Sequence, residues 1–282
     1  MMPQASLLSG DRLHLSHGPI DLIIGSDGAR SVAFRAAFAR FESVLDELAA
    51  ELPLLRQPVE RRPEGKIARR MYRAALPYAD GVTTPMIAVA GAVAQEILAA
   101  MTEATALTRA YVNNGGDIAL HLTGAATFRV AIASPDNGNL GVVDIGSTDA
   151  IRGIATSGQR GRSLSLGIAD AVTVLARSAS MADAAATQLG NAVDLQDNAS
   201  ITRAPANVVR DDSDLGSTTV VTHVGRLAPS DVARALRAGE TAANALRQAC
   251  LIDGAALFLQ GQNAVVGLPA TLKFQQKAPE HA

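Results

Sequence analysis

Asp183 and Thr187 are two residues of this sequence that together could hold a metal ion. They lie four residues apart in an Ala-rich segment, 180–193, that predicts a helix, so their side chains share one helix face. A carboxylate and a hydroxyl suit a hard cation such as Mg²⁺, which keeps waters and substrate phosphates in the rest of its shell. The structural alternative is a helix start, with Asp183 near the positive end of the dipole and Thr187 exposed.

A glycine-rich turn is the second candidate site. Residues 113–117 read Asn-Asn-Gly-Gly-Asp, so Asn114 is followed by the pair Gly115 and Gly116 and then by Asp117. Paired glycines let the backbone turn sharply and approach a ligand closely. Asp117 could accept hydrogen bonds from a ribose or a base. The alternative is a plain tight hairpin in which Asp117 bonds to the turn itself.

The third candidate is a loop over residues 156–162, where Thr156, Ser157 and Gly158 precede Arg160. Exposed N–H groups and guanidinium forks match phosphate oxygens, so this loop predicts an anion-binding segment. A charged surface loop with no ligand has a similar composition. Asp170 is the fourth candidate, because it interrupts two apolar runs, and a charge in that position must be paired, solvated or functional.

The elements that position these residues are predicted from hydrophobic spacing. A hairpin is expected over 11–24, closed at His17 and Gly18. A long helix follows over 31–51, ended by Pro53, with its core face formed by the stripe Phe34, Phe38, Phe41, Leu45 and Leu48. Further helices are expected over 85–105, 180–193 and 229–250. Short extended runs are expected at 111–112, 118–122, 128–134, 141–145, 163–166, 172–175, 220–224, 255–260 and 264–268.

Helices that alternate with antiparallel hairpins favour an α+β fold with a mainly antiparallel sheet and packed helices. No linker or repeat divides the 282 residues, so we expect one domain over 1–282 with a frayed tail from about residue 274. Hydrophobic residues make up 48% and charged residues 18% of the chain, which indicates a globular protein.

Composition also excludes several classes of partner. The net charge is −2 and aromatic residues make up 3%, so the chain has neither the broad basic field nor the stacking rings that would favour binding to nucleic acid.

The single cysteine cannot form an internal disulfide. The longest apolar run, 86–101, carries Gln95 and Glu96, and the N-terminus has no signal-peptide pattern. We therefore expect a cytoplasmic protein with no membrane segment.

The order of these four segments, together with a Val-Thr-Val run, resembles the ApbE-like superfamily. A GGD turn, a TSG loop, an IxD segment ending at Asp170, a Val-Thr-Val run at 172–174 and a DAxxT helix start at Asp183 follow one another as they do in that family. The resemblance is good over about 81–193 and is closest to an uncharacterised branch. It implies a T-fold-like architecture, a bound FAD or FMN, Mg²⁺, and transfer of FMN from FAD to a Ser or Thr hydroxyl of an acceptor protein, with AMP leaving.

Carried over by position, the resemblance assigns roles to individual residues. The metal would be held by Asp183 and Thr187, and Asp170 would be the catalytic carboxylate. The flavin nucleotide would be bound by Asn114, Gly115, Gly116, Asp117, Thr156, Ser157, Gly158 and Arg160.

The sequence also departs from the family pattern. Gly167 stands where the HIxDP segment has His, Ala171 where it has Pro, and Gln159 where an Asp follows TSG; the 88–95 segment lacks the lysine of AKG. Three hypotheses follow. The leading one is a flavin-nucleotide protein with Mg²⁺-dependent FMN or nucleotidyl transfer as its candidate activity. The others are a non-catalytic flavin or nucleotide carrier and an enzyme that uses another small molecule, so whether the protein is an enzyme stays open.

Overall fold

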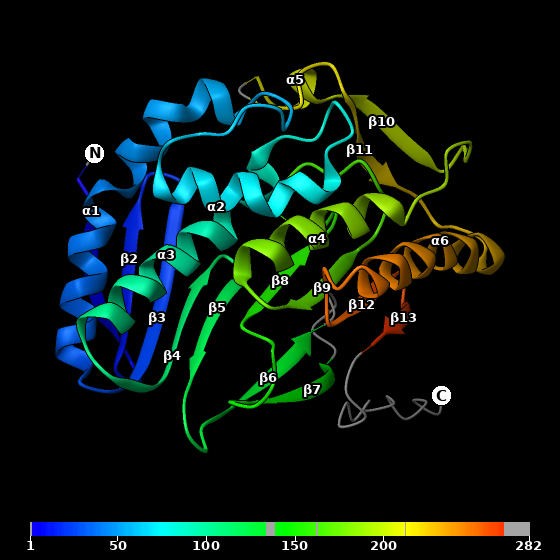
Figure 1. Ribbon diagram of the computed structural model, residues 1–282. Coiled ribbons are helices and arrows are strands. Elements are labelled where there is room, and N and C mark those ends of the chain that lie inside the picture. Colours follow the sequence, from blue (N-terminus) through cyan, green and yellow to red (C-terminus); the bar gives the residue numbers. More distant parts are fainter. Residues whose placement is uncertain (1, 134–138, 162, 212, 268–282) are drawn as a thin grey trace.

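The computed structural model describes residues 2–133, 139–161, 163–211 and 213–267 (Figure 1). The strands are β1 (Gln4–Leu8), β2 (Arg12–His17), β3 (Ile20–Gly28), β4 (Leu107–Asn114), β5 (Asp117–Leu122), β6 (Thr127–Ala133), β7 (Asn139–Gly146), β8 (Gly153–Ser157), β9 (Ala171–Ala176), β10 (Ile201–Pro205), β11 (Thr219–Val224), β12 (Gly254–Leu259) and β13 (Gln262–Val266). The helices are α1 (Arg30–Leu55), α2 (Lys66–Ala75), α3 (Val89–Ala104), α4 (Ala179–Ala192), α5 (Ala206–Val209) and α6 (Pro229–Gln248), with short 3₁₀ turns η1 (Leu76–Tyr78) and η2 (Pro85–Ala88).

One nine-stranded sheet organises the molecule. Its order is β1-β2-β3-β4-β5-β8-β9-β12-β13, and each pairing between neighbouring strands is antiparallel. Two separate two-stranded sheets, β6–β7 and β10–β11, are antiparallel as well. The expected α+β class with a mainly antiparallel sheet is therefore confirmed. The expectation of one domain stays a prediction, and the frayed tail from residue 274 lies outside the described residues.

The sheet is covered differently on its two faces. The long helices lie on one face, and the β6–β7 hairpin lies toward the lower edge in Figure 1. Along β9, Val172 and Val174 pack with α4 and α6, whereas Ala171 and Leu175 pack with β6 and β7. Successive side chains of a strand point to opposite faces, so a strand covered on both faces reads as a continuous apolar run. This burial explains why β9 and β12 lack polar alternation.

The N-terminal elements largely follow the sequence expectation. The β2–β3 hairpin turns between His17 and Ile20, which pair with each other. Helix α1 buries Phe41 and Leu48 of the expected stripe, and Phe34, Phe38 and Leu45 pack against the same core. The helix does not end at Pro53 as expected. Pro53 lies inside its last turn and the helix continues to Leu55, where the N–H of Arg56 donates to the carbonyl of Leu52 and the N–H of Gln57 to that of Leu54.

Several other elements were missed or wrongly expected. Strands β1, β8 and β10 and helix α2 were not predicted. The extended run expected over 163–166 is not a strand, because its backbone groups bond to separate elements instead of one neighbouring strand. The N–H of Leu166 donates to Asn191 Oδ1 at 3.1 Å, and the carbonyl of Ser165 accepts from the N–H of Val221 at 2.8 Å.

Helix α3 is the central helix of the layer. Together with η2 it is long and apolar enough to cross a membrane by length and composition, but more than half of it is buried inside the protein. Its apolar surface belongs to the core, with Ile97 and Met101 fully buried. At its N-terminal end, a Cβ on Gly91 would overlap the carbonyl of Ala179 in α4. The backbones of α3 and α4 therefore touch at this point.

A buried carboxylate joins α1, α2 and α3. Glu96 of α3 is 1% exposed and accepts from Arg40 of α1 at 3.0 Å, and from Lys66 and Arg70 of α2 at 3.1 Å each. Burial by itself raises the pKa of Glu96, but the hydrogen bonds from Lys66 and Arg40 and the charge of Arg70 outweigh it and hold that pKa below its usual value. Removing this carboxylate would leave three cations without their shared partner.

The contact at Gly91 leads to a stability prediction. Gly91→Ala adds one methyl group that favours a helix by about 1 kcal/mol, yet at this position it overlaps a backbone carbonyl. Overpacking of this kind costs about 1–3 kcal/mol, so we expect a lower Tm in thermal unfolding, by roughly 2–4 °C for each kcal/mol.

Gly146→Ala is the matched control for this change. A Cβ at Gly146 would meet nothing closer than Asp149 Oδ2 at 3.6 Å, so its Tm should barely change. A Gly91→Ala protein as stable as the parent would show that α3 and α4 can separate without cost.

Candidate functional site

A pocket of about 610 Å³ lies between α1, the start of α3, the β4–β5 turn, the loop after β8, and α4. Nine of the eleven residues singled out in the sequence line it: Asn114, Gly115, Asp117, Thr156, Ser157, Gly158, Arg160, Asp183 and Thr187. Segments separated by up to 73 positions thus converge on one cavity, as expected if the motifs form a single site. The two that do not line it are Gly116 and Asp170.

The glycine pair forms a two-residue hairpin turn. Asn114 and Asp117 face each other as the last residues of β4 and first of β5, and Gly115 and Gly116 between them have φ of +64° and +115°. Both positions lie in the left-handed region that glycine tolerates. The buried amide of Asn114 donates to the carbonyl of Ala90 at 3.1 Å, which ties the turn to α3. Gly116 therefore forms part of the turn without lining the pocket, whereas Gly115 and Asp117 on either side of it line the pocket.

Asp183 is held against the first turn of α3. The N–H of Gly91 donates to Asp183 Oδ2 at 2.9 Å. Burial and the nearby carboxylate of Asp117 raise the pKa of Asp183 well above its usual value, although backbone hydrogen bonds from Gly91 and Ala90 act in the opposite direction. The helix-start alternative is not met, because α4 begins at Ala179 and Thr187 lines the pocket; Asp183 instead binds the free N–H groups at the start of α3.

The chemistry around Asp183 fits a cation. Two carboxylates, Asp183 and Asp117, line one cavity, and their mutual repulsion would be relieved by a positive ion. Thr187, one turn further along α4, lines the same cavity with its hydroxyl. The described residues contain no cluster of three His, Cys, Asp or Glu suited to a metal. Mg²⁺ needs only one or two protein carboxylates when waters and phosphates complete its shell.

The loop after β8 is shaped by Gly158. Its φ is +137°, and a Cβ there would lie 2.7 Å from the carbonyl of Asp170. Only glycine fits this position, so the loop passes close over the chain that follows. Upstream, the hydroxyls of Thr156 and Thr173 lie 3.0 Å apart across β8 and β9. The loop then carries Arg160 to the rim of the pocket.

Asp170 lies behind this loop, outside the pocket lining. It is 5% exposed, and its carboxylate accepts from Arg160 Nε at 3.1 Å, from Gln159 Nε2 at 3.3 Å and from the N–H of Gln260 at 2.5 Å. The structure therefore places Asp170 where it orients Arg160 and the loop. A catalytic role for Asp170 stays a prediction that this placement does not favour.

An apolar wall faces the polar end of the pocket and was missed by the sequence reasoning. It consists of Leu45, Leu48, Ala49, Leu52 and Leu55 of α1 with Met86, Val89, Ala90 and Val93 of η2 and α3. The sequence stripe on α1 indicated only a core face. Its continuation at spacings of four and three to Leu52 and Leu55, followed by Arg56 at the rim, was the signal that could have extended it.

Pockets of this kind, mostly apolar with a few convergent polar groups, are typical of small-molecule sites. The fold and site define an α+β protein with an apolar cleft closed by a glycine-rich, partly anionic end. A family profile described as AbpE bacteria matches residues 4–265, so the chain belongs to that family. The resemblance found in the sequence is thereby confirmed.

Some individual proteins are similar to the chain in sequence, and others align with its structure. A UPF0280 protein of Methanothrix thermoacetophila is 36% identical over 185 residues, which cover 63% of this chain and 75% of that protein. A UPF0280 protein of Methanopyrus kandleri is 37% identical over 180 residues, 61% of this chain and 69% of that one. The apo flavinyl transferase ApbE of Pseudomonas stutzeri aligns with 94% of this chain and 93% of its own at a TM-score of 0.47 and 13% identity.

The raised pKa of Asp183 gives a pH-dependent prediction. Because the folded pKa exceeds the unfolded one, charging Asp183 costs stability as pH rises through the folded pKa, and the cost vanishes below the unfolded value. Asp183→Asn keeps the shape without the charge. We expect it to raise Tm at pH 8, without divalent cations, by about 2–4 °C for each kcal/mol, and to lose this effect toward pH 4.

Asp46→Asn is the control, since Asp46 is exposed on α1 outside the pocket. Its effect on Tm should be small at each pH. Destabilisation by Asp183→Asn at pH 8 would show instead that the bonds from α3 to the charged carboxylate outweigh its burial.

Proposed function

We propose that the pocket binds a flavin nucleotide, with its phosphates at the glycine-rich end. The observation that carries this proposal is the convergence of the GGD, TSG and DAxxT segments on one 610 Å³ cavity that has an apolar wall. Membership in the AbpE family supports a flavin as the ligand. A flat apolar ring system suits the leucine and valine wall of α1 and α3, where burial excludes water from its faces.

The polar end suits the phosphates. Arg160 and Arg56 supply guanidinium groups at the rim, and Ser157 and Gly158 supply small residues that allow close approach. Mg²⁺ would be held by Asp183 and Thr187 and would act as a Lewis acid on the phosphates. A dication also offsets the charge of Asp117, which otherwise opposes the binding of an anion beside it.

FMN transfer is the less favoured activity of this site. The position of the motif histidine is Gly167, and a Cβ there would overlap the carbonyl of Gly190 in α4. No side chain fits at position 167 in this conformation. The close packing of α4 against Gly167 therefore excludes a histidine at this position. Gln159, in the place of an Asp, bonds to Asp170. Both features support a flavin-binding protein that transfers FMN to acceptor hydroxyls poorly or not at all.

The binding proposal predicts how two substitutions affect FAD affinity. In fluorescence titrations, Mg²⁺ should tighten FAD binding to the parent protein. We expect Asp183→Ala to abolish that dependence and Thr187→Ala to weaken it less, because a carboxylate brings charge to the ion and a hydroxyl only a dipole.

Asp46→Ala, which removes an acid from α1 outside the pocket, should leave both the FAD affinity and the Mg²⁺ effect as they are. A parent protein that is colourless as purified and binds neither FAD nor FMN would refute the flavin proposal. Flavin binding with equal Mg²⁺ dependence in Asp183→Ala would refute only the metal site.

Transfer is tested separately. With FAD, Mg²⁺ and an acceptor peptide carrying the Ser/Thr motif, we expect little or no flavinylated product by mass spectrometry. Loss of a positioned general acid–base group typically lowers a rate by roughly 10² to 10⁴. An authentic ApbE transferase assayed beside it is the positive control. Rapid flavinylation that disappears in Asp183→Ala would establish the transferase activity and overturn this expectation.

A further inference from the structure

Two smaller hollows adjoin each other along the start of α4. Their volumes are about 220 and 210 Å³, and both are lined by Arg70, Gln95 and Ser178. The first also contacts Arg73, Ser180 and Tyr78, among others, and the second is bordered by Arg152, Arg177 and His121. Neither shares a lining residue with the flavin pocket.

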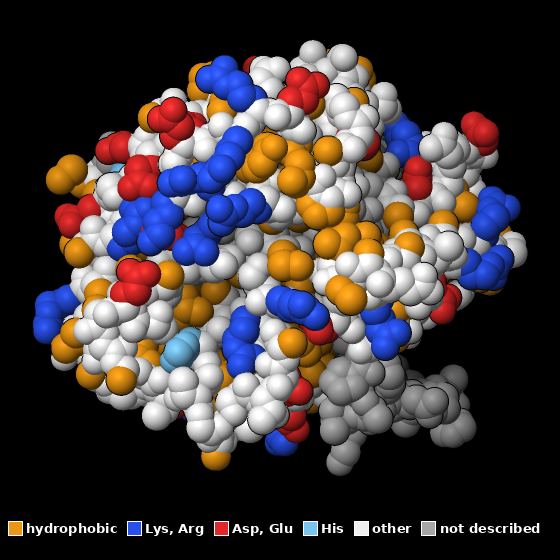
Figure 2. Space-filling view, in the orientation of Figure 1, with side chains coloured by type: hydrophobic (Ala, Val, Ile, Leu, Met, Phe, Trp, Pro, Cys, Tyr) orange, Lys and Arg blue, Asp and Glu red, His pale blue; other side chains and the backbone are white. Residues whose placement is uncertain are grey.

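The charges around these hollows are unbalanced. Four arginines line them, and their described linings include no Asp or Glu. Figure 2 shows a dense group of basic side chains over α2 and its neighbours on this face, and further ones below it. Because α2 places Arg70 and Arg73 three residues apart, both side chains lie on one face of the helix.

The four arginines are positioned in different ways. Arg70 is oriented by Glu96, a carboxylate that it shares with Arg40 and Lys66. The guanidinium of Arg152 donates to the carbonyls of Ser147, Asp149 and Ile151 at 2.6–2.7 Å, which fixes it without neutralising its charge.

Arg73 and Arg177 are exposed, and within the described part of the chain neither forms an ion pair. The charge of Arg177 is felt by the carboxylate of Asp253, just as Glu96 binds Arg70, so Arg73 is the arginine of the cluster whose charge is least offset in the described part of the chain.

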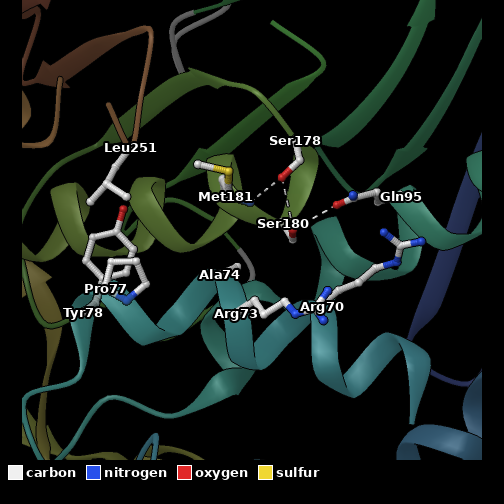
Figure 3. A pocket seen from close by; sticks show the side chains of 10 residues that line it. All are labelled: Arg70, Arg73, Ala74, Pro77, Tyr78, Gln95, Ser178, Ser180, Met181 and Leu251. Atoms are coloured by element: carbon white, nitrogen blue, oxygen red, sulfur yellow. Dashed lines mark hydrogen bonds between the residues drawn. The ribbon is translucent and has the colours of Figure 1, made fainter. Parts of the chain in front are cut away.

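Neutral hydrogen-bonding groups complete the lining. The hydroxyl of Ser180 donates to Gln95 Oε1 at 2.9 Å and lies 3.3 Å from the hydroxyl of Ser178 (Figure 3). Arg70 and Arg73 extend from α2 beside this network in the same view. The amide N–H₂ of Gln95 is thereby turned away from Ser180, and small hydroxylated residues leave the space between the helices open.

We propose that these two adjoining hollows bind the diphosphate group of a small compound around the residues they share, Arg70, Gln95 and Ser178, as a site separate from the flavin pocket. Guanidinium forks match phosphate oxygens in geometry, and each phosphate carries more charge than a carboxylate. Each hollow is large enough for a phosphate group. Inorganic pyrophosphate is the simplest compound of this class and serves as the probe.

Calorimetric titration of the full chain with pyrophosphate, without divalent cations, tests the site. We expect binding that weakens as KCl is raised. Arg73→Ala should weaken it about tenfold, the usual effect of losing one charge-assisted hydrogen bond to an anion. Because Arg73 is exposed and contributes no ion pair to the fold, this variant should keep the Tm of the parent.

Two variants locate the binding. Arg69→Ala removes the same charge from α2 at a position outside both hollows, so the affinity should stay within about twofold of the parent. Arg160→Ala alters the phosphate end of the flavin pocket, so it should remove only a second binding event that Arg73→Ala leaves intact, while Arg73→Ala should leave FAD binding unchanged. This site and the flavin proposal can therefore fail independently.

Several results would overturn the proposal. These are absence of pyrophosphate binding to the parent, equal losses in Arg69→Ala and Arg73→Ala, or loss in Arg160→Ala alone. Binding of a short RNA oligonucleotide in place of pyrophosphate would equally overturn it, because it would identify the arginines as a surface for a polyanionic macromolecule.

Discussion

The seating of α4 on three glycines is the constraint on which the site depends. A Cβ at Gly91 of α3, at Gly153 of β8 or at Gly167 would overlap the backbone of α4 or of the residue before it. Because these three glycines have no side chains, α4 packs closely against α3 and the sheet. Asp183 then reaches the free N–H groups at the start of α3, and Thr187 faces the same cavity.

The same contact brings two pairs of polar groups together near the N-terminal ends of α3 and α4. Gly91 and Gln95 lie one turn apart on α3 and meet Asp183 and Ser180, which lie one turn apart on α4. Burying Asp183 beside Asp117 is costly for the free protein, since like charges and desolvation both disfavour its ionised form. The cation proposed for this pocket would offset that cost.

Most of the residues singled out in the sequence line one pocket, whereas several elements around that pocket were not predicted. Motif residues such as Gly115 and Gly158 are needed for the local backbone conformation, since both have positive φ. A glycine required for this reason can be recognised from the sequence alone. Helix α2 was missed although its buried residues Ile67, Met71 and Ala74 recur at helical spacing; it is only ten residues long, and Glu96, which binds its Lys66 and Arg70, lies far away in the sequence. The pocket wall was missed for a related reason: a leucine that faces a cavity and one that faces the core have the same periodicity, and only the assembled helices distinguish them.

Gly167 shows how binding and transfer can separate within one fold. Replacing a catalytic histidine by glycine would usually leave a gap that water could fill. Here the backbone of Gly190 and Asn191 occupies that place, so the chain has closed over the position. The groups that line the cavity, which include the GGD turn, the Gly158 loop and the α3–α4 contact, are set mainly by backbone geometry and do not need that histidine. A ligand scaffold of this type can keep its affinity while it loses a reaction, because the interactions that hold the ground state are distinct from those that move a proton.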